Sequence, residues 1–426
     1  MPRITKVHAR EVLDSRGTPT VEVEVHCQSG AFGRAIVPSG ASTGKFEACE
    51  LRDHDPLRYD GRGVLNSVEN VRRILGPAIE GCDATDQQML DERLLSLDST
   101  PQKTRLGGNA LLGVSLAAAH AGAAAQRLPL YRHLNELFNA HDPAPENVSP
   151  KMPLPMTNMI SGGLHAGGNL DFQDFLILPV GAQRYTQRLE WIVRVYRRLG
   201  ELLSNAGYEG RLVGDEGGYG PRLKSNAEAV EFIVRAIEAA HLRPGEDVAI
   251  ALDVAATHFF DGECYRLSAT GDQLLMSGEL IDQLESLVNR FPIVSIEDGL
   301  AEDDWDGWQE MSRRLGQRVR LVGDDLFVTN TERLQEGIRR KVANAVLIKV
   351  NQIGTLTETF RTLHLARQAG YASVVSARSG ETEDSTISDL AVGVQAEQIK
   401  IGCIVRGERL AKYNQLLRIA EVLEAD

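Results

Sequence analysis

Three acidic residues follow short apolar runs in the C-terminal two thirds of the chain. They are Asp253, Glu297 and Asp324. If these runs are parallel strands of one barrel, their carboxyl ends meet at the same mouth and the three carboxylates converge. Carboxylates without interleaved His or Cys suit Mg²⁺, which prefers oxygen ligands and keeps positions for water or substrate. The alternative for each acid is that it caps the helix that follows.

Two lysines, Lys349 and Lys400, close further apolar runs and are expected beside these acids. A neighbouring cation or burial lowers the pKa of a lysine amine and makes it a general base. Together with metal-binding acids, such an amine suits removal of a proton beside a carboxylate, because the resulting negative charge can be stabilised by a cation. The alternative is that the lysines form salt bridges with the acids.

Two glycine-rich loops contain further candidates. Glu216 lies between glycines in GRLVGDEGG, residues 210–218, where a protonated carboxyl would give its proton to a departing hydroxide. SGASTG, residues 39–44, is either a hinged lid or a flexible turn. Neither loop is specific for catalysis on its own.

Eight short apolar runs are expected to position these residues. The residues that close the later runs are 22 to 44 positions apart, mostly one strand and one helix each. Buried parallel strands have continuous apolar sequences, and eight of them indicate an α/β fold with a β/α (TIM-like) barrel. A doubly wound open sheet is the alternative, but no GxGxxG or GxxxxGK[ST] loop is present. The runs are residues 175–180, 211–214, 248–252, 293–296, 319–322, 345–348, 373–375 and 398–401.

The N-terminal part has a different pattern. Residues 3–12 and 20–27 alternate apolar and polar side chains around a turn, which predicts an antiparallel hairpin, and a third strand is expected at 34–37. We therefore predict a smaller α+β domain over residues 1–141, with the possible lid at 39–44, and the barrel domain over 142–426, beginning with a proline-rich linker at 142–155. Helical patterns cover residues 64–75, 86–95 and 109–126.

Composition excludes several classes of protein. The chain has 426 residues, ordinary globular composition and a formal charge of −13, which argues against nucleic acid or an anionic membrane as partner. Its five cysteines form no CxxC pair, which predicts free thiols rather than a disulfide framework or a zinc site. No signal peptide or apolar stretch long enough to span a membrane is seen, so we expect a cytoplasmic enzyme.

Several segments, in fixed order over nearly the whole chain, resemble those of the enolase family. They are DSRGTPTVEVEV (14–25), PSGASTG (38–44), ELRD (50–53), VGDEGG (213–218), SIEDGL (295–300), VGDDLFVTN (322–330), LIKVNQIGT (347–355), RSGETED (378–384) and ERLAKYNQLLRI (408–419).

The resemblance implies an N-terminal α+β domain, a barrel whose first turns depart from plain βα alternation, and usually a homodimer or larger homo-oligomer. It also implies Mg²⁺-dependent dehydration of 2-phosphoglycerate, a small phosphorylated substrate, to phosphoenolpyruvate. Lys349 would be the base at C2 and Glu216 the acid at the leaving hydroxyl. Asp253, Glu297 and Asp324 would hold one Mg²⁺, and Ser42 would help to hold a second that arrives with substrate. The substrate-binding residues would be His165, Gln173, Asp174, Arg378, Ser379 and Lys400.

Two departures from the family pattern fall in the half of the site that handles the leaving hydroxyl. Ala377 stands where enolases have His before Arg-Ser-Gly-Glu-Thr, and Asp174 stands where they have Glu. Three interpretations follow. The chain is an enolase, or a paralogue that acts on a modified phosphoglycerate or a phosphonate, as carboxyphosphonoenolpyruvate synthase does, or an inactive enolase fold that binds other molecules. The third is disfavoured because a clustered set of charged side chains is costly to keep without function.

Overall fold

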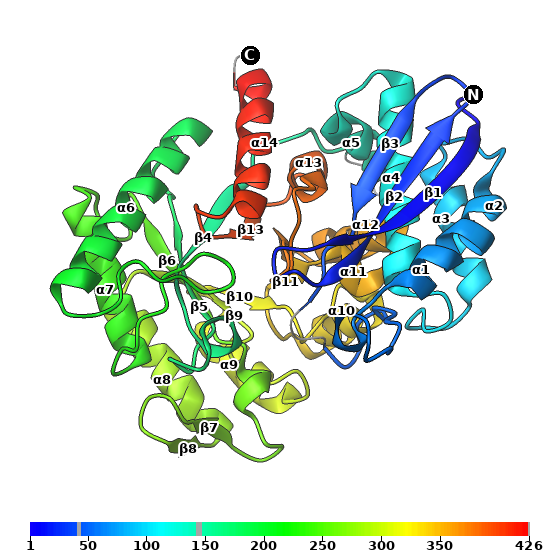
Figure 1. Ribbon diagram of the computed structural model, residues 1–426. Coiled ribbons are helices and arrows are strands. Elements are labelled where there is room, and N and C mark those ends of the chain that lie inside the picture. The colour runs from blue at the N-terminus through cyan, green and yellow to red at the C-terminus, as the bar shows by residue number, and fades with distance from the viewer. Residues whose placement is uncertain (41–43, 142–146, 425–426) are drawn as a thin grey trace.

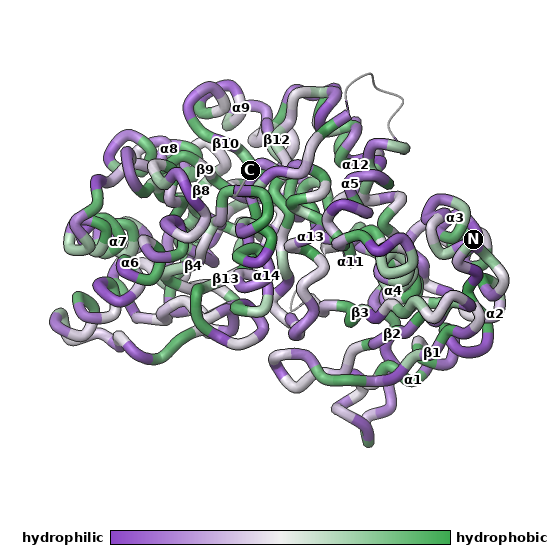
Figure 2. Tube along the Cα trace, turned by 90° about the horizontal axis from the view of Figure 1, so that it is seen from above, coloured by the Kyte–Doolittle hydropathy of each residue, from purple (hydrophilic) through white to green (hydrophobic). Residues whose placement is uncertain are grey.

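The computed structural model describes residues 1–40, 44–141 and 147–424. It contains an N-terminal sheet with helices and a C-terminal barrel, which lie side by side in Figures 1 and 2. Figure 2 shows hydrophilic residues mainly along the outer loops and helices of both parts. The predicted α/β class and barrel are confirmed. The boundary between residues 141 and 142 stays a prediction.

The N-terminal sheet consists of β1 (Ile4–Leu13), β2 (Pro19–Cys27) and β3 (Phe32–Ile36), all antiparallel. Its buried face packs on α4 (Gly108–Gln126), an alanine-rich helix. At Gly33 a Cβ atom would lie 2.1 Å from a carbonyl oxygen of α4, so only glycine allows this approach. The other helices are α1 (Leu65–Asn70), η2 (Val71–Leu75), α2 (Gly76–Ile79), α3 (Gln87–Asp98) and α5 (Leu130–His141), with the short η1 (Tyr59–Gly61).

Eight strands close the barrel in the order β10-β11-β12-β13-β4-β5-β6-β9. Apolar side chains fill its interior, including Met156, Leu176 and Val322. A larger cluster of buried apolar side chains lies between the outer face of the strands and the surrounding helices. The strands are β4 (Leu154–Ser161), β5 (Asp174–Leu178), β6 (Ala249–Asp253), β9 (Ile293–Glu297), β10 (Arg320–Gly323), β11 (Ala345–Ile348), β12 (Ala372–Ser376) and β13 (Gln398–Gly402).

Helices surround the barrel, and a small hairpin of β7 (Tyr265–Leu267) and β8 (Gln273–Leu275) lies outside it (Figure 1). No helix in the described residues is both long and apolar enough to cross a membrane. All five cysteines are free, as predicted. The helices are α6 (Tyr185–Asn205), α7 (Asn226–Ala239), α8 (Ser277–Arg290), α9 (Trp305–Leu315), α10 (Thr331–Arg340), α11 (Val350–Ile353), α12 (Leu356–Gln368), α13 (Thr386–Gly393) and α14 (Gly407–Leu423), with η3 (Gly163–Ala166) and η4 (Ala256–Phe259).

The barrel differs from the predicted set of strands in two places. Residues 211–214 are not a strand of the barrel, because Val213 makes only an isolated bridge to Tyr219. The missing strand is β4, which begins inside the predicted proline-rich linker and pairs with β13. In addition, β5 runs antiparallel to both β4 and β6, so seven strands are parallel and one is reversed. This agrees with the implied departure from βα alternation at the start of the barrel.

The N-terminal part also contacts the barrel mouth. Ser39 and Gly380 exchange two backbone hydrogen bonds of 2.8 and 2.9 Å. Ser15 donates a further backbone bond to the Glu381 carbonyl oxygen at 2.7 Å. These contacts place Ser15 and Ser39 beside the loop that follows β12, so both parts of the chain border the mouth.

Candidate functional site

The predicted acidic residues lie together at the carboxyl ends of the barrel strands. Asp253 and Glu297 are the last residues of β6 and β9 and face each other in the parallel register. Asp324 follows β10 directly. All three are nearly excluded from solvent. The convergence expected from the strand pattern is therefore present in the fold.

The two lysines form ion pairs with these acids. Lys400 Nζ is 2.7 Å from Asp253 Oδ2 and 2.8 Å from the carboxylate oxygens of Glu297. Lys349 Nζ makes an ion pair with Asp324, whose other oxygen accepts a 2.8 Å hydrogen bond from Gln352. The salt bridges that the sequence left open as an alternative are thus formed.

Buried negative charge is the main electrostatic feature of the site. Burial and the neighbouring charge of Asp253 raise the pKa of Glu297 to about 8. Burial and the charge of Asp324 raise the pKa of Asp325 to about 7. Burial opposes ionisation of Lys349, but the charge of Asp324 outweighs it, so its pKa is raised. A lysine that acts as a base is expected to have a lowered pKa. The pKa of Lys349 is not lowered here, because its amine forms an ion pair with a carboxylate.

Two groups of acids that share Asp324 could hold a cation. In the predicted trio, Lys400 bridges Asp253 and Glu297, whereas Lys349 pairs with Asp324. Asp298 Oδ1 and Oδ2 accept the backbone N–H groups of Asp324 and Asp325 at 2.9 and 2.7 Å. In the described part of the chain, two groups of side chains bring three ligand atoms within 4.8 Å of one another. These groups are Asp298 with Asp324 and Asp325, and His165 with Asp174 and Glu216.

His165 and Asp174 form a second polar pair, of which only His165 lines the cavity described below. His165 Nδ1 lies 2.9 Å from Asp174 Oδ2, and Asn158 donates to the other oxygen of Asp174. Burial opposes protonation of His165, but the charges of Asp174 and Glu216 outweigh it and raise its pKa to about 9. The raised pKa favours the protonated imidazole, and the fully buried Asp174, whose own pKa burial raises, is its ion-pair partner.

The remaining predicted residues border the same space. Gln173 Nε2 donates to Asp253 Oδ2 at 3.1 Å. Arg378 Nη1 lies 3.0 Å from Glu47 Oε2, and Ser379 Oγ accepts from Arg16 at 3.3 Å. Ser42 lies outside the described residues. One cavity brings most of the predicted groups together, but Asp174 and Glu297 are not part of its lining. Its lining includes His165, Gln173, Glu216, Asp253, Asp324, Lys349, Ala377, Arg378, Ser379 and Lys400, together with His258, Asp298 and Asp325.

Several residues at the site were missed by the sequence analysis. Glu47, which pairs with Arg378, and Asn351, whose side-chain oxygen accepts from Arg378 at 2.8 Å, carry no local signal of this role. Asp298 lies inside the segment SIEDGL, but only Glu297 was assigned from it. Arg16 lies inside DSRGTPTVEVEV, where the turn was predicted and the contact with Ser379 was not.

Comparison with known families gives two matches. The family model for the enolase C-terminal TIM barrel domain matches residues 149–426. The model for the enolase N-terminal domain matches residues 4–134. Together they cover nearly the whole chain.

Proposed function

The chain belongs to the enolase family, and we propose that it catalyses the Mg²⁺-dependent dehydration of 2-phosphoglycerate to phosphoenolpyruvate. The observation that carries this proposal is a single cavity lined by an amine, an acid group, buried carboxylates and an arginine–serine pair. These are the groups needed for proton removal, hydroxyl departure, metal binding and phosphate binding. The enolase family typically contains carbon–oxygen lyases, and this reaction is of that class.

The residues take the following roles. Lys349, in its neutral form, removes the proton from C2 of the substrate, and Lys400 binds the substrate carboxylate. Glu216 donates a proton to the hydroxyl at C3, which leaves as water as the C2–C3 double bond forms. Arg378 and Ser379 bind the phosphate. Lys349 acts as a base only after it leaves its ion pair with Asp324.

The donor set fits a divalent cation. Burial, and then the charge of neighbouring carboxylates, raise the pKa values of Glu297 and Asp325, and a bound divalent cation would offset that charge. Asp253, Glu297 and Asp324 would hold Mg²⁺, since all three offer oxygen donors at one mouth. When bound, Mg²⁺ would supply positive charge beside the substrate carboxylate, where negative charge develops after proton removal. A second Mg²⁺ would arrive with the substrate, and Ser42 would help to hold it.

The proposal extends to the state of the protein in the cell. We propose a cytoplasmic homo-oligomer, a dimer or larger, that binds a small phosphorylated substrate. The formal charge of −13 disfavours nucleic acid and anionic membranes as partners.

The direct test follows the ultraviolet absorbance of the conjugated product after addition of 2-phosphoglycerate and Mg²⁺. Efficient turnover that a chelator abolishes and excess Mg²⁺ restores is the expected result. Turnover that survives complete metal removal would contradict the metal-dependent scheme. Lys349→Ala, assayed in parallel, controls for a contaminating activity in the preparation.

A second candidate function is favoured by Ala377 and Asp174. Ala377 lines the cavity beside Arg378, and its methyl group leaves more room than the imidazole found there in enolases. His165, whose pKa is raised by the charges of Asp174 and Glu216, lines the same cavity. A substrate with a further anionic group, such as a modified phosphoglycerate or a phosphonate handled by a carboxyphosphonoenolpyruvate synthase, would use both features.

Solvent exchange separates the candidates. Mg²⁺-dependent exchange of the C2 proton of 2-phosphoglycerate without elimination favours the paralogue. Elimination at a rate comparable with exchange favours the enolase. Neither signal, with Mg²⁺ binding retained, favours the inactive binding protein.

A further inference from the structure

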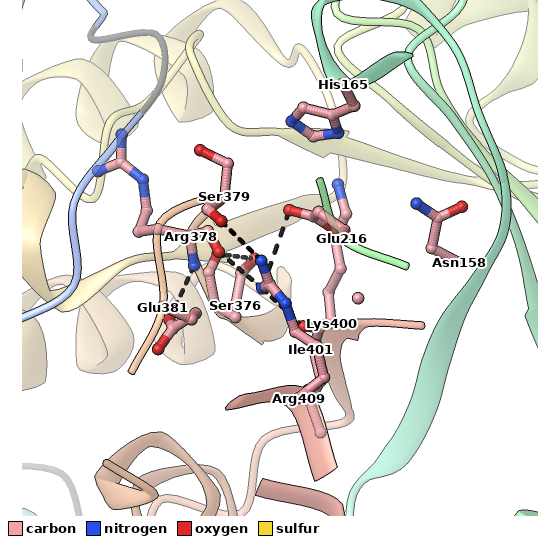
Figure 3. Close-up of polar contacts among 12 residues, drawn as sticks. Asn158, His165, Glu216, Ser376, Arg378, Ser379, Glu381, Lys400, Ile401 and Arg409 are labelled. Atoms are coloured by element: carbon pink, nitrogen blue, oxygen red, sulfur yellow. Dashed lines mark hydrogen bonds and ion pairs between the residues drawn. The ribbon is translucent and has the colours of Figure 1, made fainter. Parts of the chain in front are cut away.

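Arg409 contacts the loops of the site from the side of α14. It belongs to ERLAKYNQLLRI (408–419), which has no part in the reaction scheme above, and projects from the first turn of α14. Its side chain is fully buried. Arg409 Nη1 donates to the carbonyl oxygens of Arg378 at 2.7 Å and Ile401 at 2.9 Å, and Nη2 donates to that of Ser379 at 2.8 Å. Figure 3 shows its guanidinium directed at the loop that follows β12.

The bonded carbonyl groups belong to the residues that line the phosphate side of the cavity. A trans peptide directs its C=O and the following N–H to opposite sides. Holding the Arg378 carbonyl on Arg409 therefore turns the Ser379 N–H away from α14. Without Arg409 these carbonyl oxygens would be free to rotate towards the cavity, where their partial negative charge would repel an anion.

The same side chain is fitted into the end of β13. Gly402 has a φ of +105°, and a Cβ atom there would lie 3.0 Å from Arg409 Cδ. Arg409 Nη1 is also 4.0 Å from Glu216 Oε1. The guanidinium thus joins the loop after β12, the end of β13 and the loop that contains Glu216.

Only arginine among the cationic residues provides this set of bonds. Its planar guanidinium has five N–H donors in a fixed fork, whereas a lysine ammonium donates from one nitrogen. Burying a cation is costly for stability, and an apolar side chain of similar volume often fills such a position equally well. The cost is understandable if the three bonded carbonyls must be held in one orientation.

We propose that Arg409 is a positioning residue for anion binding, which keeps the carbonyl groups of Arg378 and Ser379 directed away from a bound phosphate. The inference rests on the proposed function only in taking Arg378 and Ser379 as the phosphate-binding residues. Arg409 does not line the cavity, and it acts through the backbone of the loop after β12.

The test measures binding of inorganic phosphate, in the presence of Mg²⁺, by isothermal titration calorimetry of the intact protein. Arg409→Met should raise the Kd for phosphate by about tenfold or more, because loss of charge-assisted hydrogen bonds frees the loop. The Kd of Arg409→Lys for phosphate should lie between those of the wild type and Arg409→Met. If Arg409→Met does not fold, the comparison of Arg409→Lys with wild type decides the question alone.

Leu416→Ala is the matched control. Leu416 is buried on the same helix and is apolar, so its truncation destabilises α14 without removing a bond to the loop. Phosphate affinity within about twofold of wild type is expected for it, although its melting temperature falls by several degrees. With 2-phosphoglycerate, Arg409→Lys should raise KM more than it lowers kcat.

Three results would overturn the inference. The first is wild-type phosphate affinity in Arg409→Lys, and the second is equal loss of affinity in Leu416→Ala and Arg409→Met. The third is absence of phosphate binding by the wild-type protein. Failure of the proposed function has a different signature, which is phosphate binding that depends on Arg409 in a protein that does not convert 2-phosphoglycerate.

Discussion

Lys400 Nζ lies 2.8 Å from both carboxylate oxygens of Glu297. Both side chains are buried, so each charged group is stabilised by the other in place of water. A cation that binds Glu297 must compete with this ammonium group. The pair therefore links metal binding to the position of a lysine that we propose to bind the substrate carboxylate.

The two possible metal groups make different predictions for Mg²⁺ affinity. Glu297→Gln should raise the Kd for Mg²⁺ by about tenfold or more if Asp253, Glu297 and Asp324 hold the ion, because one anionic ligand is lost. Asp325→Asn should then have a much smaller effect. Calorimetric titration with Mg²⁺ measures both. The reverse order would place the ion at Asp298, Asp324 and Asp325 instead.

Lys349→Ala should abolish exchange of the C2 proton with solvent, because no other amine is assigned to that carbon. Mg²⁺ affinity should be kept or rise slightly, since the ammonium group no longer competes for Asp324. Proton NMR in deuterated water measures exchange on 2-phosphoglycerate. Exchange that persists in this variant would show that another group is the base.

His165 should titrate above neutral pH because of Asp174. Its pKa of about 9 keeps the imidazole protonated at pH 7.5. Asp174→Asn removes the nearest negative charge, so the pKa should fall towards 6.5 and the ring should be largely neutral at that pH. Histidine NMR titration measures the shift. His133, whose pKa burial lowers to about 4, serves as the internal reference and should not move.

Ala377→His together with Asp174→Glu should raise the rate of elimination from 2-phosphoglycerate by about tenfold or more. This holds if these two positions are what makes the leaving-hydroxyl side of the site differ from that of enolases. The reason is that a displacement of ~1 Å at a reacting group can cost a large factor in rate. Steady-state absorbance assays of the double variant and both single variants measure the change. A double variant slower than the wild-type protein would indicate a site adapted to a different substrate. The structure adds one constraint, since the longer side chain at position 174 must fit between Asn158 and His165.

Much of the fold was predictable because local patterns report buried strands. The runs that lead to Asp253, Glu297 and Asp324 are strands, and their carboxyl ends meet. The start of the barrel was not predictable in the same way. Prolines 153 and 155 indicated a linker, but pairing with β13 makes residues 154–161 a strand, since tertiary hydrogen bonds override a local preference. The run at 211–214 was too short to distinguish a strand from an extended loop.

The sequence by itself determined that Asp253, Glu297, Asp324, Lys349 and Lys400 gather at the barrel mouth, because each closes a predicted strand. Only the tertiary structure decided how those groups pair. Glu47 meets Arg378 across 331 positions of chain, and Arg409 bonds to carbonyl groups about 30 positions before it. Such contacts depend on distances and directions between elements that are far apart along the chain, which no local pattern encodes.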